Sequence, residues 1–417
     1  MSGPTILAII VVITILVVFM VASPQVAMYS AGAVFLVGAA LATGALLQNG
    51  DSAHRQRTGG AGLELFPWHG AKLTADELAA AKSVAKPAKT IPATVAGDLP
   101  SHLPYRVGLY PRRVAAHVGQ RKLLMSEVDF LTDFARRGDT VVYAGSAPGI
   151  HIPYLASLFD SLHLTFELYD PREFDLPKWE GRVIPRINTH QGFFTDETAA
   201  EYAGRDDVLF ISDIRTGGHE AGLPGEEDVS RDMHQQEKWV LAMQPRAFML
   251  KFRLEYFKEG IRDFEYLDGE ARIQAWAPPA SSETRLVAER PPGGYKRRKY
   301  DQAKYDRQMF YANSILREWG SFDVGVSPSA AKGVDTCFDC ALEAHMWRKF
   351  LGEAATPAKL AQMFNDTSRA LQRPLLKPPH GLEPEVPMTE KRERVVVHAR
   401  PRRNIPSGGD PRGERRT

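Results

Sequence analysis

The stretch from residue 140 to residue 159 constrains the fold of this 417-residue chain more than any other. An apolar, β-branched run ends in the small-residue turn G-S-A-P-G, and a helix-like segment follows it. This order of strand, glycine loop and helix is typical of the first unit of a nucleotide-binding α/β sheet. Gly145 and Gly149 would let the backbone approach a ligand closely, because a glycine carries no Cβ. An ordinary tight turn looks the same, so the neighbouring segments must decide between the two.

Strand-like and helix-like segments alternate along most of the chain after residue 103. The expected strands are Thr140–Ala144, Leu164–Tyr169, Arg182–Ile187, Val208–Ile214, Ala247–Phe252, Ala271–Trp276 and Thr284–Ala288. The expected helices are Thr74–Ala85, Lys122–Arg136, His151–Leu162, Thr195–Tyr202, Val229–Met243, Asp301–Trp319, Cys337–Leu351 and Pro357–Gln372. This alternation predicts an α/β fold with a mostly parallel central sheet, helices on both faces and an antiparallel edge.

Both ends of the chain differ in composition from this region. The apolar stretches Ile6–Ala22 and Val26–Leu47 are each close to the length that crosses a bilayer, which predicts a transmembrane hairpin within residues 1–48. A single anchor, or a buried second helix, is the alternative. Arginines directly after the hairpin predict a membrane-anchored protein whose remaining part faces the cytosol. Residues 49–98 suit a linker, and residues 374–417 suit a basic disordered tail that contacts RNA or an anionic membrane, or is merely solvated.

Charge and cysteine content narrow the class of protein further. The formal net charge is only +2, so local patches matter more than a global field. Two cysteines, Cys337 and Cys340, are too few for a disulfide-built scaffold. They form a C-x-x-C motif to which His345 would add a third ligand, but a fourth ligand for zinc is not evident. The motif therefore favours two packing cysteines on a helix, and we expect no metal.

Charged residues stand where the expected strands end. Asp170 and Asp213 close the second and fourth strands, Lys251 lies in the fifth, Glu283 precedes the last, and Lys122 begins the helix before the glycine loop. Each suits a surface or capping position when it is considered singly. Ligands bind at the carboxyl ends of strands in open parallel sheets, so together these residues predict one chemical site. An acid in the position of Asp170 commonly binds the ribose hydroxyls of a nucleoside cofactor.

Five motifs carry a resemblance to a known family. In chain order they are G-Q-R-K-L-L-M-S-E, V-V-Y-A-G-S-A-P-G-I-H-I-P-Y-L, L-F-I-S-D-I-R, F-M-L-K-F-R and S-S-E-T-R-L. Their order and spacing resemble the poxvirus-type cap-specific mRNA 2′-O-methyltransferases, which in poxviruses also serve as a regulatory subunit of poly(A) polymerase. The resemblance covers residues 99–373. It implies a Rossmann-like, S-adenosylmethionine-dependent methyltransferase encoded by a large DNA virus.

The resemblance also implies a role for each matching residue. Lys122, Asp213, Lys251 and Glu283 would form a catalytic tetrad in which Lys251 removes the proton of a ribose 2′-hydroxyl. The implied cofactor contacts are Gln120, Tyr143, Gly145, Gly149, His151, Asp170, Arg172 and Ile214. A free lysine has a pKa of about 10.4. We therefore expect burial and the second lysine to lower the pKa of Lys251 more than the two carboxylates raise it.

The implied cap-binding residues form a less complete set. Tyr256 and Asp306 match family positions, and Tyr105 is the expected second stacking aromatic. Lys258 stands where the family has an acid, and Ala280 stands where an aromatic is expected. Three functions remain open: methylation of capped mRNA, non-catalytic RNA binding as an accessory subunit of poly(A) polymerase, and methylation of uncapped RNA. The candidates for contacts with RNA phosphates are Arg112, Arg113, Arg215 and Arg253.

Overall fold

The structure is a computed structural model that describes residues 74–95, 99–104, 118–216, 225–254, 263–278 and 281–375. These residues lie in one compact unit, Leu63–Thr417. The helices include α3 (Ala75–Val84), α4 (Gly119–Phe134), α5 (Ile152–Leu158), α6 (Asp196–Glu201), α7 (Glu226–Met243), α8 (Gln302–Tyr311), α9 (Arg317–Trp319), α10 (Phe338–Leu351) and α11 (Pro357–Ala370). A π-helical turn, Ala312–Leu316, joins α8 to α9.

A seven-stranded sheet has the order β3-β2-β1-β4-β5-β8-β7. Its strands are β1 (Thr140–Ala144), β2 (Thr165–Asp170), β3 (Ile187–Gln191), β4 (Val208–Ser212), β5 (Ala247–Phe252), β7 (Glu270–Arg272) and β8 (Thr284–Glu289). The first five strands pair in parallel, and β8 runs antiparallel to both of its neighbours. The chain reverses its winding direction between β1 and β4, where open α/β sheets form a ligand crevice.

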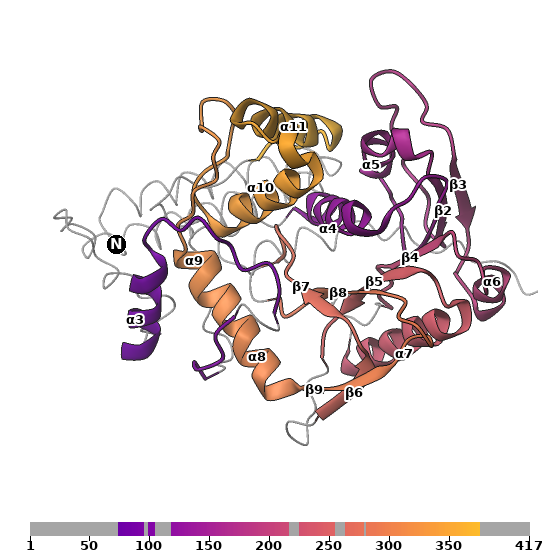
Figure 1. The fold of residues 1–417 in the computed structure, drawn as a ribbon, viewed down its shortest axis with the longest axis horizontal. Coiled ribbons are helices and arrows are strands. Elements are labelled where there is room, and N and C mark those ends of the chain that lie inside the picture. Colours follow the sequence, from indigo (N-terminus) through magenta and orange to yellow (C-terminus); the bar gives the residue numbers. More distant parts are fainter. Residues whose placement is uncertain are drawn as a thin grey trace, which may run out of the picture. The chain divides into compact units, whose positions relative to one another are not determined.

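The central strands are apolar on both faces because helices cover both. Every residue of β1, β4 and β5 is buried, as expected for parallel strands between two helical layers. Helices α4 and α5 cover one face of the sheet, and α6 and α7 cover the other (Figure 1). The prediction of a mostly parallel α/β sheet with an antiparallel edge is therefore confirmed.

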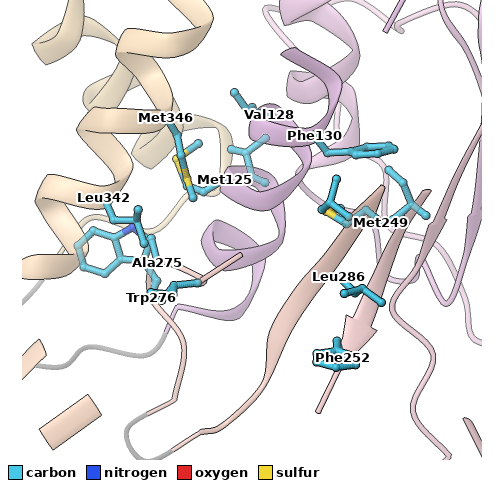
Figure 2. Packing of buried hydrophobic residues seen from close by; sticks show 14 of the residues in the cluster. Met125, Val128, Phe130, Met249, Phe252, Ala275, Trp276, Leu286, Leu342 and Met346 are labelled. Atoms are coloured by element: carbon cyan, nitrogen blue, oxygen red, sulfur yellow. The ribbon is translucent and has the colours of Figure 1, made fainter. Parts of the chain in front are cut away.

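Helix α4 lies between the sheet and α10. Its apolar stripe includes Met125 and Phe130, which are fully buried. Figure 2 shows Met125 beside Met346 of α10, whereas Phe130 lies toward Met249 of β5. The residue that begins the expected tetrad, Lys122, is therefore carried on a helix packed on two sides.

Two strand predictions differ from the structure, and one pair of strands was not predicted. The expected strand Arg182–Ile187 is wrong, since β3 begins where that range ends. The expected strand Ala271–Trp276 is much shorter, because the main-chain groups of Gln274 and Trp276 bond to helical side chains instead of a neighbouring strand. A two-stranded ribbon of β6 (Asp263–Leu267) and β9 (Arg297–Asp301) was not predicted.

The predicted transmembrane hairpin requires correction. Residues 1–48 lie outside the described residues, as do the basic tail and most of the linker. Within the described ranges, no helix has the length and apolar composition that a bilayer crossing needs. The hairpin, the membrane-anchored localisation and the membrane contact that it implied are therefore not supported by the structure and are not carried further.

Candidate active site

Two lysine–carboxylate pairs lie at the carboxyl edge of the sheet. Asp213 directly follows β4, and Lys251 lies near the end of β5, the neighbouring strand. The Nζ of Lys251 is 3.0 Å from Oδ1 of Asp213 and donates to the Asp213 backbone oxygen at 3.2 Å. The Nζ of Lys122 donates to Oε1 of Glu283 at 3.0 Å. The structure thus brings all four residues of the expected tetrad to one place.

An arginine absent from the sequence prediction joins the two pairs. Nη2 of Arg285 lies 2.6 Å from Oδ1 of Asp213 and 4.0 Å from Oε1 of Glu283. Arg285 follows Glu283 by two residues into strand β8, so the two side chains share a face of the sheet. That period-two spacing in the S-S-E-T-R-L motif is the signal by which Arg285 could have been found.

Burial and charge act in opposite directions on these groups. Burial lowers the pKa of Lys251 below its usual value, and the cations of Lys122 and Arg285 lower it further, against the raising effect of Asp213 and Glu283. Burial alone would raise the pKa of Asp213, but Lys251, Arg285 and Lys122 outweigh it and lower that pKa to about 2. The pKa of Glu283 is likewise held well below its usual range. Both carboxyls are therefore ionised at neutral pH, whereas the surroundings favour the neutral form of Lys251.

The glycine loop after β1 packs against the chain that follows β4. Gly145 has φ +81°, and a Cβ there would lie 2.9 Å from the backbone nitrogen of Ile214. Buried Asp170, at the end of β2, accepts the backbone N–H of Ala147 at 3.1 Å. Arg172 pairs with Asp170 and donates to the Ala147 oxygen at 2.7 Å. This loop conformation therefore depends on a glycine, an acid and an arginine that the sequence had assigned to cofactor binding.

One cavity of about 900 Å³ opens onto both groups of residues. Its wall includes the expected cofactor residues Gly145, Asp170, Arg172 and Ile214 together with the tetrad residues Asp213 and Lys251. Lys122 and Glu283 are not among its lining residues. These residues suit a nucleoside-bearing methyl donor, because a carboxylate at the position of Asp170 commonly binds ribose hydroxyls and Gly145 lets the loop beside it close against the backbone of Ile214.

The other expected cofactor residues lie apart from this cavity. Tyr143 donates to Oε1 of Glu127 at 2.8 Å, and the two ring nitrogens of His151 lie 2.9 Å from Glu127 and 2.8 Å from Gln120. All but Gln120 are almost fully buried. Gly149 has φ +72° and packs on Leu176. Glu127, which organises this network, was not predicted, although it ends the G-Q-R-K-L-L-M-S-E motif.

Only one expected cap residue can be examined. Tyr105 and Tyr256 lie outside the described residues, as do Lys258, Ala280, Arg112 and Arg113. Asp306 is buried on α8, and burial raises its pKa to about 6 against the lowering effect of Arg253 and Arg307. Its Oδ1 has no hydrogen-bond partner among the described residues.

Two arginines expected at RNA phosphates form ion pairs inside the protein. Nη2 of Arg215 lies 3.5 Å from Oε2 of Glu283, and its Nη1 lies 3.8 Å from Asp232. Arg253 pairs with Glu226 at 2.9 Å. Arg215 therefore belongs to the charge cluster around the tetrad as well as to the cavity wall.

The C-x-x-C motif lies at the start of α10. Cys337 is the N-cap residue, and its Sγ accepts the backbone N–H of Cys340 at 3.4 Å. The nearest third polar group is Asp335 rather than the predicted His345, and the three ligand atoms lie within 4.8 Å of one another. Both cysteines are buried, and the N-cap contact helps to fix their positions at the start of α10.

The strand order, the glycine loop after β1 and the acid at the end of β2 define a Rossmann-like methyltransferase fold. A family model described as the poly(A) polymerase regulatory subunit matches residues 95–325, which is more than half of the chain. The chain belongs to this family.

Two viral relatives carry the same descriptive name, cap-specific mRNA (nucleoside-2′-O-)-methyltransferase. The one from Myxoma virus (strain Lausanne) is 33% identical over 229 residues, which cover 51% of this chain and 65% of the relative. The one from Fowlpox virus (strain NVSL) is 34% identical over 213 residues, which cover 48% and 68% respectively. The resemblance inferred from the five motifs is confirmed, although this chain spans less than two-thirds of the Myxoma relative.

Among solved structures, a chain described as a ribosomal RNA methyltransferase from Plasmodium falciparum is 12% identical with a TM-score of 0.26. The match covers 40% of this chain and 94% of that one. At this TM-score we base no argument on the likeness.

Proposed function

We propose that this chain transfers a methyl group from S-adenosylmethionine to the ribose 2′-hydroxyl of the first transcribed nucleotide of capped mRNA, converting cap 0 to cap 1. Residues 99–373 would form the catalytic domain. The observation that supports the proposal most strongly is the shared cavity. The Lys251–Asp213 pair forms a wall of the same space as Gly145 and Asp170, so a nucleoside cofactor and a reacting hydroxyl could meet there.

The residues of the cavity wall suit the cofactor. Asp170 would accept from its ribose hydroxyls, while Gly145 and Ile214 would pack against it. Gln120, Tyr143, Gly149 and His151 would act from behind the glycine loop, and Arg172 would hold Asp170 in place. When bound, S-adenosylmethionine supplies a methyl group carried on a sulfonium.

Lys251 would act as the general base. A ribose hydroxyl is a weak nucleophile until its proton is removed, and a neutral amine at Nζ can accept that proton. Asp213 orients the amine through its carboxylate and its backbone oxygen. Lys122 and Arg285 help to keep the pKa of Lys251 low, and Glu283 holds Lys122.

Capped mRNA is the proposed partner. A methylated guanine is a cation with an aromatic face, so it would stack between Tyr105 and Tyr256 and interact with Asp306. The raised pKa of Asp306 fits a buried carboxyl that would gain a further cationic neighbour when the ligand binds.

One alternative follows from the family description. As a regulatory subunit of a poly(A) polymerase, the chain would bind RNA and the polymerase catalytic subunit without catalysing transfer. A further alternative, methylation of uncapped RNA, is favoured by Lys258 and Ala280, where the family has an acid and an expected aromatic.

A transfer assay separates the three functions. The full chain is incubated with labelled S-adenosylmethionine and RNAs that bear a methylated cap, an unmethylated guanosine cap or a triphosphate end. Transfer to capped RNA only, reduced about 100-fold or more in Lys251→Ala, is expected for a general base. RNA binding without transfer would overturn the catalytic proposal in favour of the regulatory subunit. Equal transfer to all three RNAs would overturn the role of the cap.

A further inference from the structure

We infer that helix α10 belongs to the working site and that its residues Asp339 and Glu343 position the Lys122–Glu283 pair. The inference rests on the proposed function and extends it to residues beyond the 95–325 region that the family model matches. Neither residue touches the cavity, so both would be positioning residues rather than catalytic ones.

A chain of hydrogen bonds connects Asp339 to Glu283. The amide nitrogen of Gln274 donates to Oε1 of Glu283 at 3.3 Å and to its backbone oxygen at 3.0 Å. Nη2 of Arg317 donates to the backbone oxygen of Gln274 at 2.8 Å. Nε of Arg317 donates to Oδ1 of Asp339 at 3.2 Å, and the same oxygen accepts the backbone N–H of Trp276 at 3.0 Å. Asp339 therefore fixes the backbone of residues 274–276 at two points: at Gln274 through Arg317 and at Trp276 directly. From this segment the side chain of Gln274 contacts Glu283.

A second set of contacts fixes the helix turn that carries Lys122. Arg121 precedes Lys122 and forms a two-pronged ion pair with Glu343, with Nε to Oε2 at 2.7 Å and Nη2 to Oε1 at 2.6 Å. Glu343 also accepts from the indoles of Trp276 at 2.6 Å and Trp347 at 3.0 Å. The N-cap residue of α4, Val118, makes no side-chain cap, so the Arg121–Glu343 pair anchors the first turn of the helix from the side.

The cost of burying these charges indicates a geometric role. Arg121 and Glu343 are both 0% exposed, and a buried ion pair often stabilises a fold no better than an apolar pair of similar size. A fork-shaped guanidinium does, however, fix direction as well as distance. Met346 and Leu342 of α10 already pack on Met125 and Trp276 (Figure 2), so apolar contact between the two helices does not require the ion pair.

The test compares two matched aspartates in the full chain. Asp339→Asn removes a buried carboxylate that holds one arginine and one backbone N–H beside the site. Asp139→Asn removes one that holds Arg246 and the Arg136 N–H at the opposite end of β1. We expect both variants to melt at lower temperature. Only Asp339→Asn should lower kcat, by about tenfold or more because small misplacements are costly, with KM for S-adenosylmethionine unchanged.

A second variant guards against unfolding, and a second readout does not need activity. The double change Arg121→Met with Glu343→Leu removes both buried charges together, so it should lower the melting temperature less than Arg121→Met alone and still lower kcat. The carbon-13 shift of the Glu283 carboxyl is followed against pH. The pKa that it reports should be higher in Asp339→Asn than in wild type or Asp139→Asn. The inference would be overturned if Asp339→Asn and the Arg121→Met, Glu343→Leu double variant both kept the wild-type kcat and the wild-type pKa of Glu283. An inactive wild type would instead overturn the proposed function, while the Glu283 titration would still decide the inference.

Discussion

At the scale of single residues, the chemistry depends on how a buried lysine is surrounded. Lys251 faces two carboxylates, which favour its charged form, as well as Lys122 and Arg285, which oppose it. Burial is the largest influence, and the net result is a lowered pKa. Asp213 and Glu283 therefore offset the effect of the Lys122 and Arg285 cations, but they do not bring the pKa of Lys251 back to that of a free lysine.

A pH–rate profile tests this balance at Lys251. Because the pKa of Lys251 is lowered, log kcat should rise with pH and then reach a plateau. The midpoint of the rise should lie below 10.5, the usual pKa of a lysine. Lys251→Arg should lose about 100-fold or more of kcat, since a guanidinium keeps the charge beside Asp213 but cannot accept a proton. Single-turnover rates across the pH range measure both effects. A profile that stays flat between neutral and alkaline pH, or an active arginine variant, would contradict the general-base role.

At the scale of secondary-structure elements, the site depends on two loops that touch. The turn after β1 lies against the chain after β4, and Gly145 is the point of closest approach. Asp232 of α7 holds the second loop from its other side, accepting the N–H of Thr216 at 2.7 Å and its hydroxyl at 2.6 Å. The sheet therefore positions the strands, and α7 fixes the loop that follows β4.

Two glycine substitutions separate backbone strain from this loop contact. Gly145→Ala and Gly138→Ala both place a side chain at a positive φ, +81° and +85°, so each should cost about 1–2 kcal/mol of unfolding free energy. Nothing lies within 4 Å of a Cβ at Gly138, whereas one at Gly145 would meet Ile214. Calorimetric titration with S-adenosylmethionine should show weakened binding for Gly145→Ala alone. Equal affinity in the two variants would show that the close approach does not shape the cofactor site.

At the scale of the whole molecule, the charge cluster makes stability depend on pH. The unfolded chain protonates Asp213 near its usual pKa of 3.8, but the folded chain does so only near 2. The unfolded state therefore binds more protons between these values. This contribution to stability is fully present above pH 3.8 and is lost as the pH falls through 2, with Glu283 acting in the same direction.

Urea unfolding at several pH values tests this contribution. Asp213→Asn should be less stable than wild type at neutral pH, by on the order of 2 kcal/mol or more. The difference should shrink as the pH falls from 3.8 through 2, because the unfolded wild-type chain binds a proton at Asp213 in this range while the folded chain does not do so until about pH 2. Asp139→Asn is the control, since burial raises rather than lowers the pKa of that carboxyl. A constant difference between Asp213→Asn and wild type from pH 7 to pH 2 would contradict this account.

Local pattern was sufficient for the central strands, for the glycine loop and for the placement of Asp213 and Lys251 at strand ends. β1 and β5 match their predicted ranges because fully buried parallel strands appear as short continuous apolar runs bounded by polar or small residues. Asp213 and Lys251 could be grouped because the carboxyl ends of parallel strands meet at one edge of a sheet, and the resemblance of the five motifs added Lys122 and Glu283. The hairpin predicted at residues 1–48 gained no support, since those residues lie outside the described ranges and no described helix could cross a bilayer.

Contacts between distant parts of the chain were decided only by the tertiary structure. Arg285 became part of the tetrad's surroundings, and Glu127 became the centre of the network around His151. Arg121 and Glu343 are 222 positions apart, and no local period relates them. Amino-acid sequence by itself determined which segments form strands and which charged residues reach the ligand edge, because backbone periodicity is local. Only folding decided which buried charges became partners, because the neutralisation of a buried charge depends on where other segments pack.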